Sequence, residues 1–205
     1  MTTMTEVPVK QVGLRERKKA RTRAAIRQHA LRLFRQQGYD ATTIEQIADA
    51  AEVSPATFFR YFPTKEDVVL QDDFDIVTLA ALEAQPAELS PIAAFRAAAV
   101  MARRQMTPEE LGRFTETTQL TLAVPEIRAR ALDELIRTTD EIATAIAART
   151  GRTSDDFAVR NMAGAIIGVI MTATMPWHAE STTDIDAMFD QIDSSLAHLE
   201  AGLPL

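Results

Sequence analysis

The chain has 205 residues with 22 Lys and Arg, 29 Asp and Glu and no cysteine, and its formal net charge is -7 at pH 7. The lack of cysteine excludes disulfide frameworks, thiolate metal sites and cysteine nucleophiles. The charge is uneven, because residues 1–65 contain twelve basic and six acidic residues, whereas residues 66–205 contain ten and twenty-three. The N-terminal end is therefore suited to a polyanion, although a basic run alone is equally typical of a solvated helix face.

No apolar core precedes the charged run near the N-terminus, so this segment does not resemble a secretory signal. The longest apolar run, residues 162–177, is shorter than the ~20 residues that a membrane-spanning helix needs. We therefore expect a soluble, cytoplasmic protein.

Turn and cap signals divide the chain into helices, and no segment has the pattern of a strand. We predict an all-α fold of about nine helices, with three short helices up to about residue 62 and roughly six longer ones after it. The first helix ends at Gly38, and its apolar face is formed by Ile26, Ala30, Leu33 and Phe34. The second begins at Thr42 or Thr43, where Glu45 or Gln46 can complete a capping box, and ends near residue 51.

The stretch SPATFFRYF, residues 54–62, holds four of the twelve aromatic residues of the chain. On a helical wheel Phe58 and Phe62 lie together, flanked by Pro55 and Phe59, and we expect these aromatic residues to form a core. The opposite face is small or polar and carries Ala56, Thr57, Arg60 and Tyr61. Two amphipathic helices joined by a short turn form a helix-turn-helix, and the outer face of the second is suited to the major groove of DNA.

Several residues around this face are candidates for DNA contacts. Arg60 is suited to a guanine or a phosphate, and Thr57 and Ala56 to a thymine methyl or a close approach. Tyr61 and Lys65 are suited to phosphates. Cations near the start of the first helix can reach the flanking backbone or a minor groove as a flexible arm: Arg15, Arg17, Lys18, Lys19, Arg21 and Arg23.

The run ALRLFRQQGYDATTIEQIADAAEVSPATFFRYFPTKEDVV, residues 30–69, resembles the N-terminal domain of the tetracycline-repressor (TetR) family of bacterial transcription regulators. The resemblance covers about residues 15–70. It depends on the order and spacing of five short motifs: Gly38-Tyr39, Thr42-Thr43, Ile47-Ala48, Val53-Ser54 and Phe62 to Glu66. It implies a homodimer whose two recognition helices read successive major grooves of a palindromic operator, usually to repress nearby genes.

The resemblance also implies roles by position. Thr43 would face a phosphate at the start of the second helix, and Tyr61 and Lys65 would clamp phosphates. The base-reading start of the third helix would comprise Ser54, Pro55, Ala56 and Thr57. Two positions depart from the family pattern. Glu52 stands where glycine is common, which implies strain in the turn, and Phe59 stands where tyrosine is common, which puts one phosphate contact in doubt.

Beyond residue 63, Pro125 begins a helix, and Gly151 and Gly202 each end one. Other helix starts are predicted at polar caps: Thr64, Ser90, Thr107, Thr153 and Thr183. We assign residues 1–14 to a flexible arm, residues 15–63 to the helix-turn-helix domain and residues 64–205 to an effector-binding and dimerisation domain.

The segment MAGAIIGVIMTATM is apolar around the whole helix, so we expect it to be buried on all sides. Gly164, Gly168 and Thr172 form a stripe of small residues that lets two helices approach closely. This fits either a core helix within one chain or a helix against a partner chain, and the family resemblance favours the partner. The last helix adds the matching apolar face of the predicted dimer interface: Ile185, Met188, Phe189, Ile192 and Leu196.

We expect an effector pocket among the helices from about residue 91 to residue 178, although apolar stripes are more often plain core. The methionine-rich candidate lining is Phe95, Met101, Met106, Phe114, Met162, Ile166, Met171, Met175 and Trp177. A charged head group of an effector could be met by Arg103, Arg104 or His178.

The sequence argues against an enzyme, because it has no glycine-rich phosphate loop and no Gly-x-Ser-x-Gly turn. Its three histidines are scattered and none has a metal-ligand partner at helical spacing, so we expect no metal and no cofactor. The predicted partners are operator DNA, a small-molecule effector and a second copy of the chain. Alternatives are an activator of the same fold, or a ligand-binding module or enzyme with a vestigial helix-turn-helix.

Overall fold

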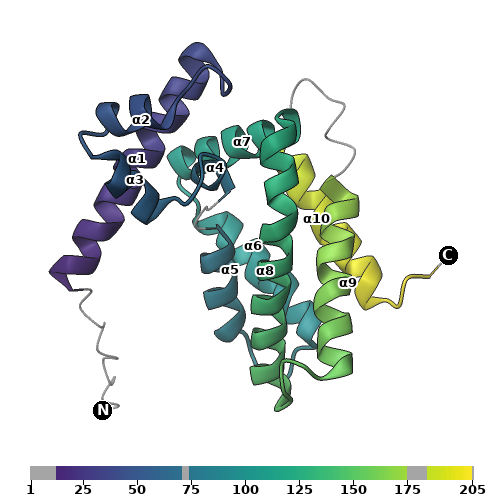
Figure 1. Cartoon of the computed structure of the whole chain (residues 1–205). Coiled ribbons are helices and arrows are strands. Elements are labelled where there is room, and N and C mark those ends of the chain that lie inside the picture. Colours follow the sequence, from purple (N-terminus) through teal and green to yellow (C-terminus); the bar gives the residue numbers. More distant parts are fainter. Residues whose placement is uncertain (1–12, 71–73, 175–183, 205) are drawn as a thin grey trace, which may run out of the picture. The chain divides into compact units, whose positions relative to one another are not determined.

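The computed structural model describes residues 13–70, 74–174 and 184–204 (Figure 1). These residues form ten helices and no strand, which confirms the all-α prediction. The chain divides into two compact units, Met1–Val68 and Val69–Leu205. This division falls five residues after the boundary expected from the sequence.

The first unit contains α1 (Leu14–Gln37), α2 (Ile44–Ala50) and α3 (Pro55–Tyr61). Gly38 ends α1 with φ 87° and ψ 159°, a conformation that essentially only glycine adopts. A full capping box between Thr43 and Gln46 begins α2, and the Ser54 hydroxyl caps α3. With 24 residues, α1 is longer than predicted, and it includes the cations expected in a flexible arm.

The core of the first unit lies between these three helices, which pack α1 on α2 and α2 on α3. Phe58 and Phe62 are fully buried, as predicted, at 5.9 Å between ring centroids. Phe59 is instead 50 % exposed and makes a T-shaped contact with Phe58, at 5.7 Å between ring centroids, so its predicted place in the core is wrong. Leu31 replaces Leu33 as the most buried leucine of α1, because the apolar face of this long helix is turned slightly from the expected one.

The short helix α4 (Asp67–Leu70) crosses the boundary between the units. It begins where Thr64 and Asp67 exchange two hydrogen bonds, from each backbone N–H to the other side chain, as the cap prediction required. The sequence predicted one long helix here. The structure has α4 and α5 (Phe74–Glu83), and residues 71–73 between them lie outside the described part of the chain.

The second unit continues with α6 (Pro91–Gln105), α7 (Pro108–Ala123), α8 (Pro125–Thr150), α9 (Phe157–Thr174) and α10 (Ile185–Glu200). Ser90 and Thr107 cap α6 and α7 as predicted. The start of α9 is capped by Asp156 rather than Thr153, because the Asp156 carboxylate accepts the backbone N–H groups of residues 158 and 159. Asp184 caps α10, and the predicted cap Thr183 lies outside the described residues.

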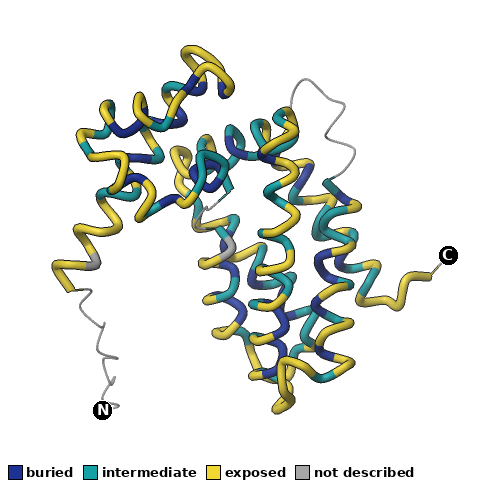
Figure 2. The backbone as a smooth tube through the Cα atoms, in the orientation of Figure 1, coloured by how far each residue is buried: buried dark blue, intermediate teal, exposed yellow. Residues whose placement is uncertain are grey.

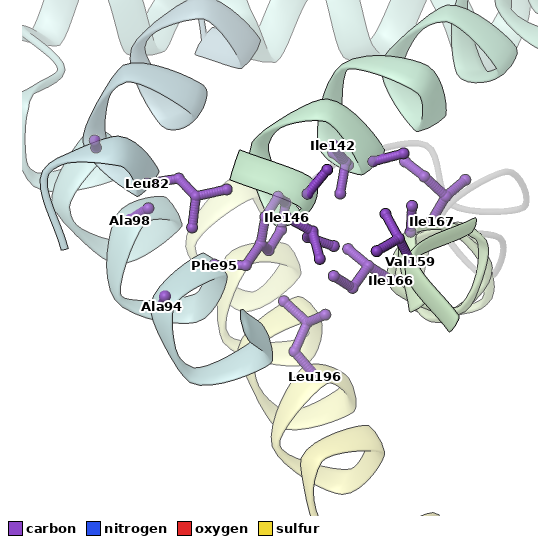
Figure 3. Close-up of a cluster of buried hydrophobic side chains, with 14 residues drawn as sticks. Leu82, Ala94, Phe95, Ala98, Ile142, Ile146, Val159, Ile166, Ile167 and Leu196 are labelled. Carbon is purple, nitrogen blue, oxygen red and sulfur yellow. The ribbon is translucent and has the colours of Figure 1, made fainter. Parts of the chain in front are cut away.

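The core of the second unit is a cluster of aliphatic residues around one phenylalanine, contributed by α5, α6, α8, α9 and α10. In Figure 3 the side chains of Phe95, Ile146 and Leu196 converge from three of these helices. Burial of each large side chain stabilises the fold by roughly 1.5–3 kcal/mol. This packing holds α9 between α8 and α10.

The helix α9 is long and apolar enough, by length and composition alone, to cross a membrane, and 28 % of that window is buried. A core helix of a helical bundle meets the same two criteria of length and composition. One face of α9 enters the core through Val159, Ala163, Ile166 and Ile167. The opposite face is exposed, so this single chain does not bury α9 on all sides as the sequence predicted (Figure 2).

Candidate functional site

The N-terminal end of α3 presents the predicted base-reading residues. Ser54, Pro55 and Ala56 are exposed and Thr57 is partly exposed. The Ser54 hydroxyl accepts the Thr57 backbone N–H at 3.1 Å and lies 3.0 Å from the Thr57 hydroxyl. Because Phe58 and Phe62 anchor the inner face of α3, this outer face is held rigidly and remains open to a ligand.

The other predicted contacts on α2 and α3 also reach the surface of the first unit. Arg60 is exposed, and its guanidinium lies 5.2 Å from the centroid of the partly exposed Tyr61 ring. Thr43 is exposed at the start of α2, where its hydroxyl accepts the Gln46 N–H at 3.2 Å and keeps its own hydrogen to donate.

The turn between α2 and α3 contains the residue that departs from the family pattern. Glu52 has φ 54°, in the left-handed region that glycine adopts freely. The strain implied by glutamate at this position is therefore present in the backbone.

The predicted basic residues of α1 lie on the first three turns of that helix. Arg15, Lys18, Lys19 and Arg21 are all exposed, and Arg17 is exposed beside them. Arg23 is partly buried and its guanidinium lies 5.6 Å from the centroid of the Phe62 ring. These cations are therefore presented by a helix, while residues 1–12 of the expected arm lie outside the described residues.

Lys65 and Glu66 surround Tyr39 in an arrangement that we call the Tyr39 cluster. The Lys65 ammonium donates to the backbone carbonyls of Tyr39 and Thr42 at 2.9 and 3.0 Å, and it lies 3.9 Å from the Tyr39 ring centroid. The Tyr39 hydroxyl donates to the Glu66 carboxylate. Burial acts to raise the pKa of Glu66, but hydrogen bonds, led by the one from Tyr39, outweigh burial and lower that pKa.

The candidate effector residues divide into core and partly exposed positions. Phe95 and Ile166 belong to the buried core, and Met162 and Met171 pack against it. Met101 is exposed and Met106 is partly exposed. Met175, Trp177 and His178 lie outside the described residues.

Phe114, another candidate, belongs to an aromatic cluster that the sequence did not reveal. Its ring centroid lies 5.3 Å from that of Phe74 on α5 and 5.4 Å from that of Phe189 on α10, and the latter two are 5.4 Å apart. The Arg103 guanidinium lies 5.5 Å from the Phe189 centroid and pairs with Asp186. Arg103, one of the expected partners of a charged effector, therefore already pairs with a carboxylate within the unit.

A buried hydroxyl lies one helical turn after Phe74. Thr78 is only 4 % exposed, and no described residue is a hydrogen-bond partner of its Oγ1. Thr117, the other buried threonine among the described residues of this unit, instead donates to carbonyls of its own helix at 3.0 and 3.1 Å. Because a buried polar group without a partner is costly, Thr78 is a candidate for contact with a bound molecule.

The predicted dimer residues fall into two groups. Gly164, Gly168 and Thr172 lie on the exposed face of α9, and a Cβ added at either glycine would meet no atom within 4 Å. On α10, Ile185, Met188 and Leu196 are buried within the chain, and Phe189 and Ile192 are partly buried. Among the eight predicted dimer residues, the stripe of small residues on α9 is therefore the exposed part. Most of the apolar face of α10 is buried in the core of the same chain.

The C-terminal helix is also tied to α6 by charge. Arg96 makes two hydrogen bonds of 3.0 Å to the Asp193 carboxylate and a third of 3.0 Å to Glu200, which in turn accepts the Ser90 hydroxyl. These bonds, the one to Asp193 first, raise the pKa of Arg96. The network fixes α10 against α6. The outward face of α9, which packs on α10, takes no part in it and is exposed.

Known protein families match both units. The model of the MftR C-terminal domain matches residues 89–204, more than half of the chain, and that of bacterial regulatory proteins of the tetR family matches residues 26–71. The chain belongs to the tetR family. It is therefore a transcriptional regulator that binds DNA through a helix-turn-helix.

Individual tetR-family proteins show the same relationship. The chain is 36 % identical to the HTH-type transcriptional regulator TcmR of Streptomyces glaucescens over 199 residues, which cover 93 % of this chain and 88 % of TcmR. It is 40 % identical to RutR of Escherichia coli (strain K12) over 96 residues, 45 % of each chain.

Two solved structures share the fold. Thermus thermophilus FadR, a TetR-family repressor in complex with lauroyl-CoA, has a TM-score of 0.53 and 28 % identity over 89 % of this chain and 95 % of FadR. A Syntrophomonas wolfei protein of the same family has a TM-score of 0.58 and 20 % identity over 91 % of this chain and 98 % of its own.

Proposed function

We propose that this regulator is a ligand-responsive repressor that binds a palindromic operator as a homodimer and is released by a small, largely apolar effector. The observation that carries the proposal is the outer face of α3, which is exposed at its N-terminal end and anchored from inside by Phe58 and Phe62. A short helix held in this way can enter a major groove without first becoming ordered.

The DNA-binding residues have different roles in this proposal. Arg60 and the segment Ser54–Thr57 read base edges, because they occupy the exposed face of α3. Thr43 and Tyr61 bind phosphates on either side of the groove. The exposed cations of α1 add sequence-independent attraction: Arg15, Lys18, Lys19 and Arg21.

The dimer forms through the exposed face of α9 in this proposal. A stripe of Gly164, Gly168 and Thr172 lets two copies of α9 approach closely, and neither glycine is covered within the chain. The buried residues of α10 contribute by supporting α9 from behind. A two-fold axis between two such faces is the commonest symmetry of soluble oligomers and matches a palindromic operator.

The effector binds in the second unit near the aromatic cluster of Phe74, Phe114 and Phe189. FadR, whose structure contains lauroyl-CoA, is a precedent in the family for a ligand with a long apolar part. The buried Thr78 hydroxyl offers one polar contact beside apolar surroundings. Because Arg103 is already paired with Asp186, this chain favours an effector without a charged head at that position.

In this proposal the protein acts in the cytoplasm and catalyses no reaction. The test is to select binding sites from random duplex DNA, place the enriched site in a promoter and measure reporter output in cells with and without the protein. A palindromic site and a fall in output are expected. An enriched site with a rise in output would reassign the protein as an activator, and no enrichment would contradict operator binding.

A further inference from the structure

The ammonium group of Lys65 makes its hydrogen bonds inside the helix-turn-helix unit. An ammonium has three N–H groups, and two of those of Lys65 donate to the Tyr39 and Thr42 carbonyls. The ring of Tyr39 also lies close to the ammonium, with its centroid 3.9 Å from Nζ, within the range of a cation–π interaction. A DNA phosphate would therefore have to compete with these three contacts for the ammonium.

The two residues whose carbonyls accept from Lys65, Tyr39 and Thr42, lie just before the start of α2. The Thr42 carbonyl directly precedes Thr43, the N-cap of α2. Thr42 is itself buried and donates its hydroxyl to the Gly38 carbonyl at 2.7 Å, and Gln37 donates to both Thr42 and Gln46 at 3.2 and 2.8 Å. The loop between α1 and α2 is thus fixed at several points, and the two bonds from Lys65 come from beyond α3.

The second half of the Tyr39 cluster strengthens the same connection. Tyr39 is 7 % exposed and its hydroxyl donates to Glu66, the neighbour of Lys65. Residues 65 and 66 therefore hold Tyr39 by its carbonyl, its ring and its hydroxyl. Since these residues follow α3 directly, the contacts define where α3 ends relative to where α2 begins.

We propose that Lys65 is a positioning residue for DNA recognition, which fixes the start of α2 against the end of α3 and makes no contact with phosphate. This inference rests on the proposed operator binding. It differs from the phosphate clamp implied by the family resemblance, and the two roles predict opposite results for affinity, salt dependence and discrimination between DNA sequences.

The test compares the full-length protein with Lys65→Met, which keeps an unbranched side chain one atom shorter and removes its charge and its donors. Lys18→Ala, a change at an exposed cation of α1, is the matched control. Dissociation constants are measured between 50 and 200 mM salt for the selected palindrome and for a scrambled duplex of the same length. Thermal unfolding first confirms that each variant is folded at the assay temperature.

If Lys65 positions α2, Lys65→Met weakens binding to the palindrome by about tenfold or more, as when a base contact is misplaced, and weakens binding to the scrambled duplex by less than about twofold. The slope of log K against log salt on the scrambled duplex stays as in the wild type. Lys18→Ala weakens both duplexes similarly and reduces that slope by about 0.9 if it loses one phosphate.

Equal weakening on both duplexes, with a slope reduced by about 0.9, would overturn the positioning role and establish a phosphate contact. The salt slope on the scrambled duplex distinguishes a positioning role from a phosphate contact even if the wild type shows no sequence preference. A wild type without sequence preference would contradict the proposed operator binding, not the role of Lys65. A second variant, Tyr39→Phe, keeps the ring and the backbone carbonyl under Lys65. It should lose less discrimination than Lys65→Met, and a larger loss would also overturn the proposal.

Discussion

The stripe of small residues on α9 allows a test in which two physical effects have opposite signs. Gly164 and Gly168 lie within a helix, and a Cβ at either position meets nothing within 4 Å in the single chain. Alanine is favoured over glycine in a helix by about 0.8–1.0 kcal/mol, so replacing both glycines should stabilise an isolated chain by ~2 kcal/mol. If two copies of α9 instead pack closely there, the added methyl groups overpack the interface, which typically costs 1–3 kcal/mol.

Gly112 on α7 provides the matched control, because it is also exposed within a helix and a Cβ added there would also meet nothing within 4 Å. Sedimentation equilibrium measures the dimer dissociation constant, and urea unfolding at fixed protein concentration measures stability. We expect the double variant Gly164→Ala/Gly168→Ala to weaken the dimer by roughly 5- to 150-fold. Gly112→Ala should leave dimerisation unchanged and raise stability by about 1 kcal/mol. A double variant with an unchanged dissociation constant would refute the close packing of α9.

Two other predictions concern individual polar side chains, Thr78 and Glu66. Thr78→Val removes a buried hydroxyl that has no described partner and should raise the free energy of unfolding by about 1–3 kcal/mol in urea titrations; a loss of similar size would mean that the hydroxyl is satisfied within the protein. The lowered pKa of Glu66 means that its contribution to stability is present above its ordinary value of 4.5 and is lost as the pH falls through the lower folded pKa. Tyr39→Phe, which removes a hydrogen bond to Glu66, should flatten this acid-side fall in stability measured by thermal unfolding, and an unchanged fall would show that the bond does not contribute.

Local features of the fold could be predicted because their partners lie close together in the sequence. The caps at Thr43 and Thr107 pair with residues three positions on, and both form as full capping boxes. The burial of Phe58 and Phe62 follows from their spacing of four on one short helix. The same wheel placed Phe59 at the edge of that face, where spacing alone does not decide between core and solvent.

Contacts between distant parts of the chain could not be predicted in this way. The aromatic cluster joins Phe74, Phe114 and Phe189, which are separated by 40 or more residues and come from three helices. The sequence also identified Lys65 as a cation near the recognition helix, which is compatible with a phosphate contact and with an internal role. Only the positions of the Tyr39 and Thr42 carbonyls reveal that its ammonium is engaged inside the unit.

The surface of α9 illustrates a third limit. An all-apolar helix predicts burial but does not identify what covers it, and the single chain covers only one face. The sequence pattern therefore indicated the apolar character of the helix. Which of its faces is buried and which is exposed depends on how α8 and α10 pack against it.

The central claim is that the exposed face of α3 reads base sequence in an operator. The most direct test measures the affinities of the wild type and Arg60→Ala for the selected palindrome and for a scrambled duplex at one moderate salt concentration. We predict that Arg60→Ala weakens binding to the palindrome by about 1–3 kcal/mol and binding to the scrambled duplex much less, because one base contact is lost. Equal losses on both duplexes would assign Arg60 to the phosphate backbone, and a wild type that does not distinguish the two duplexes would contradict the account.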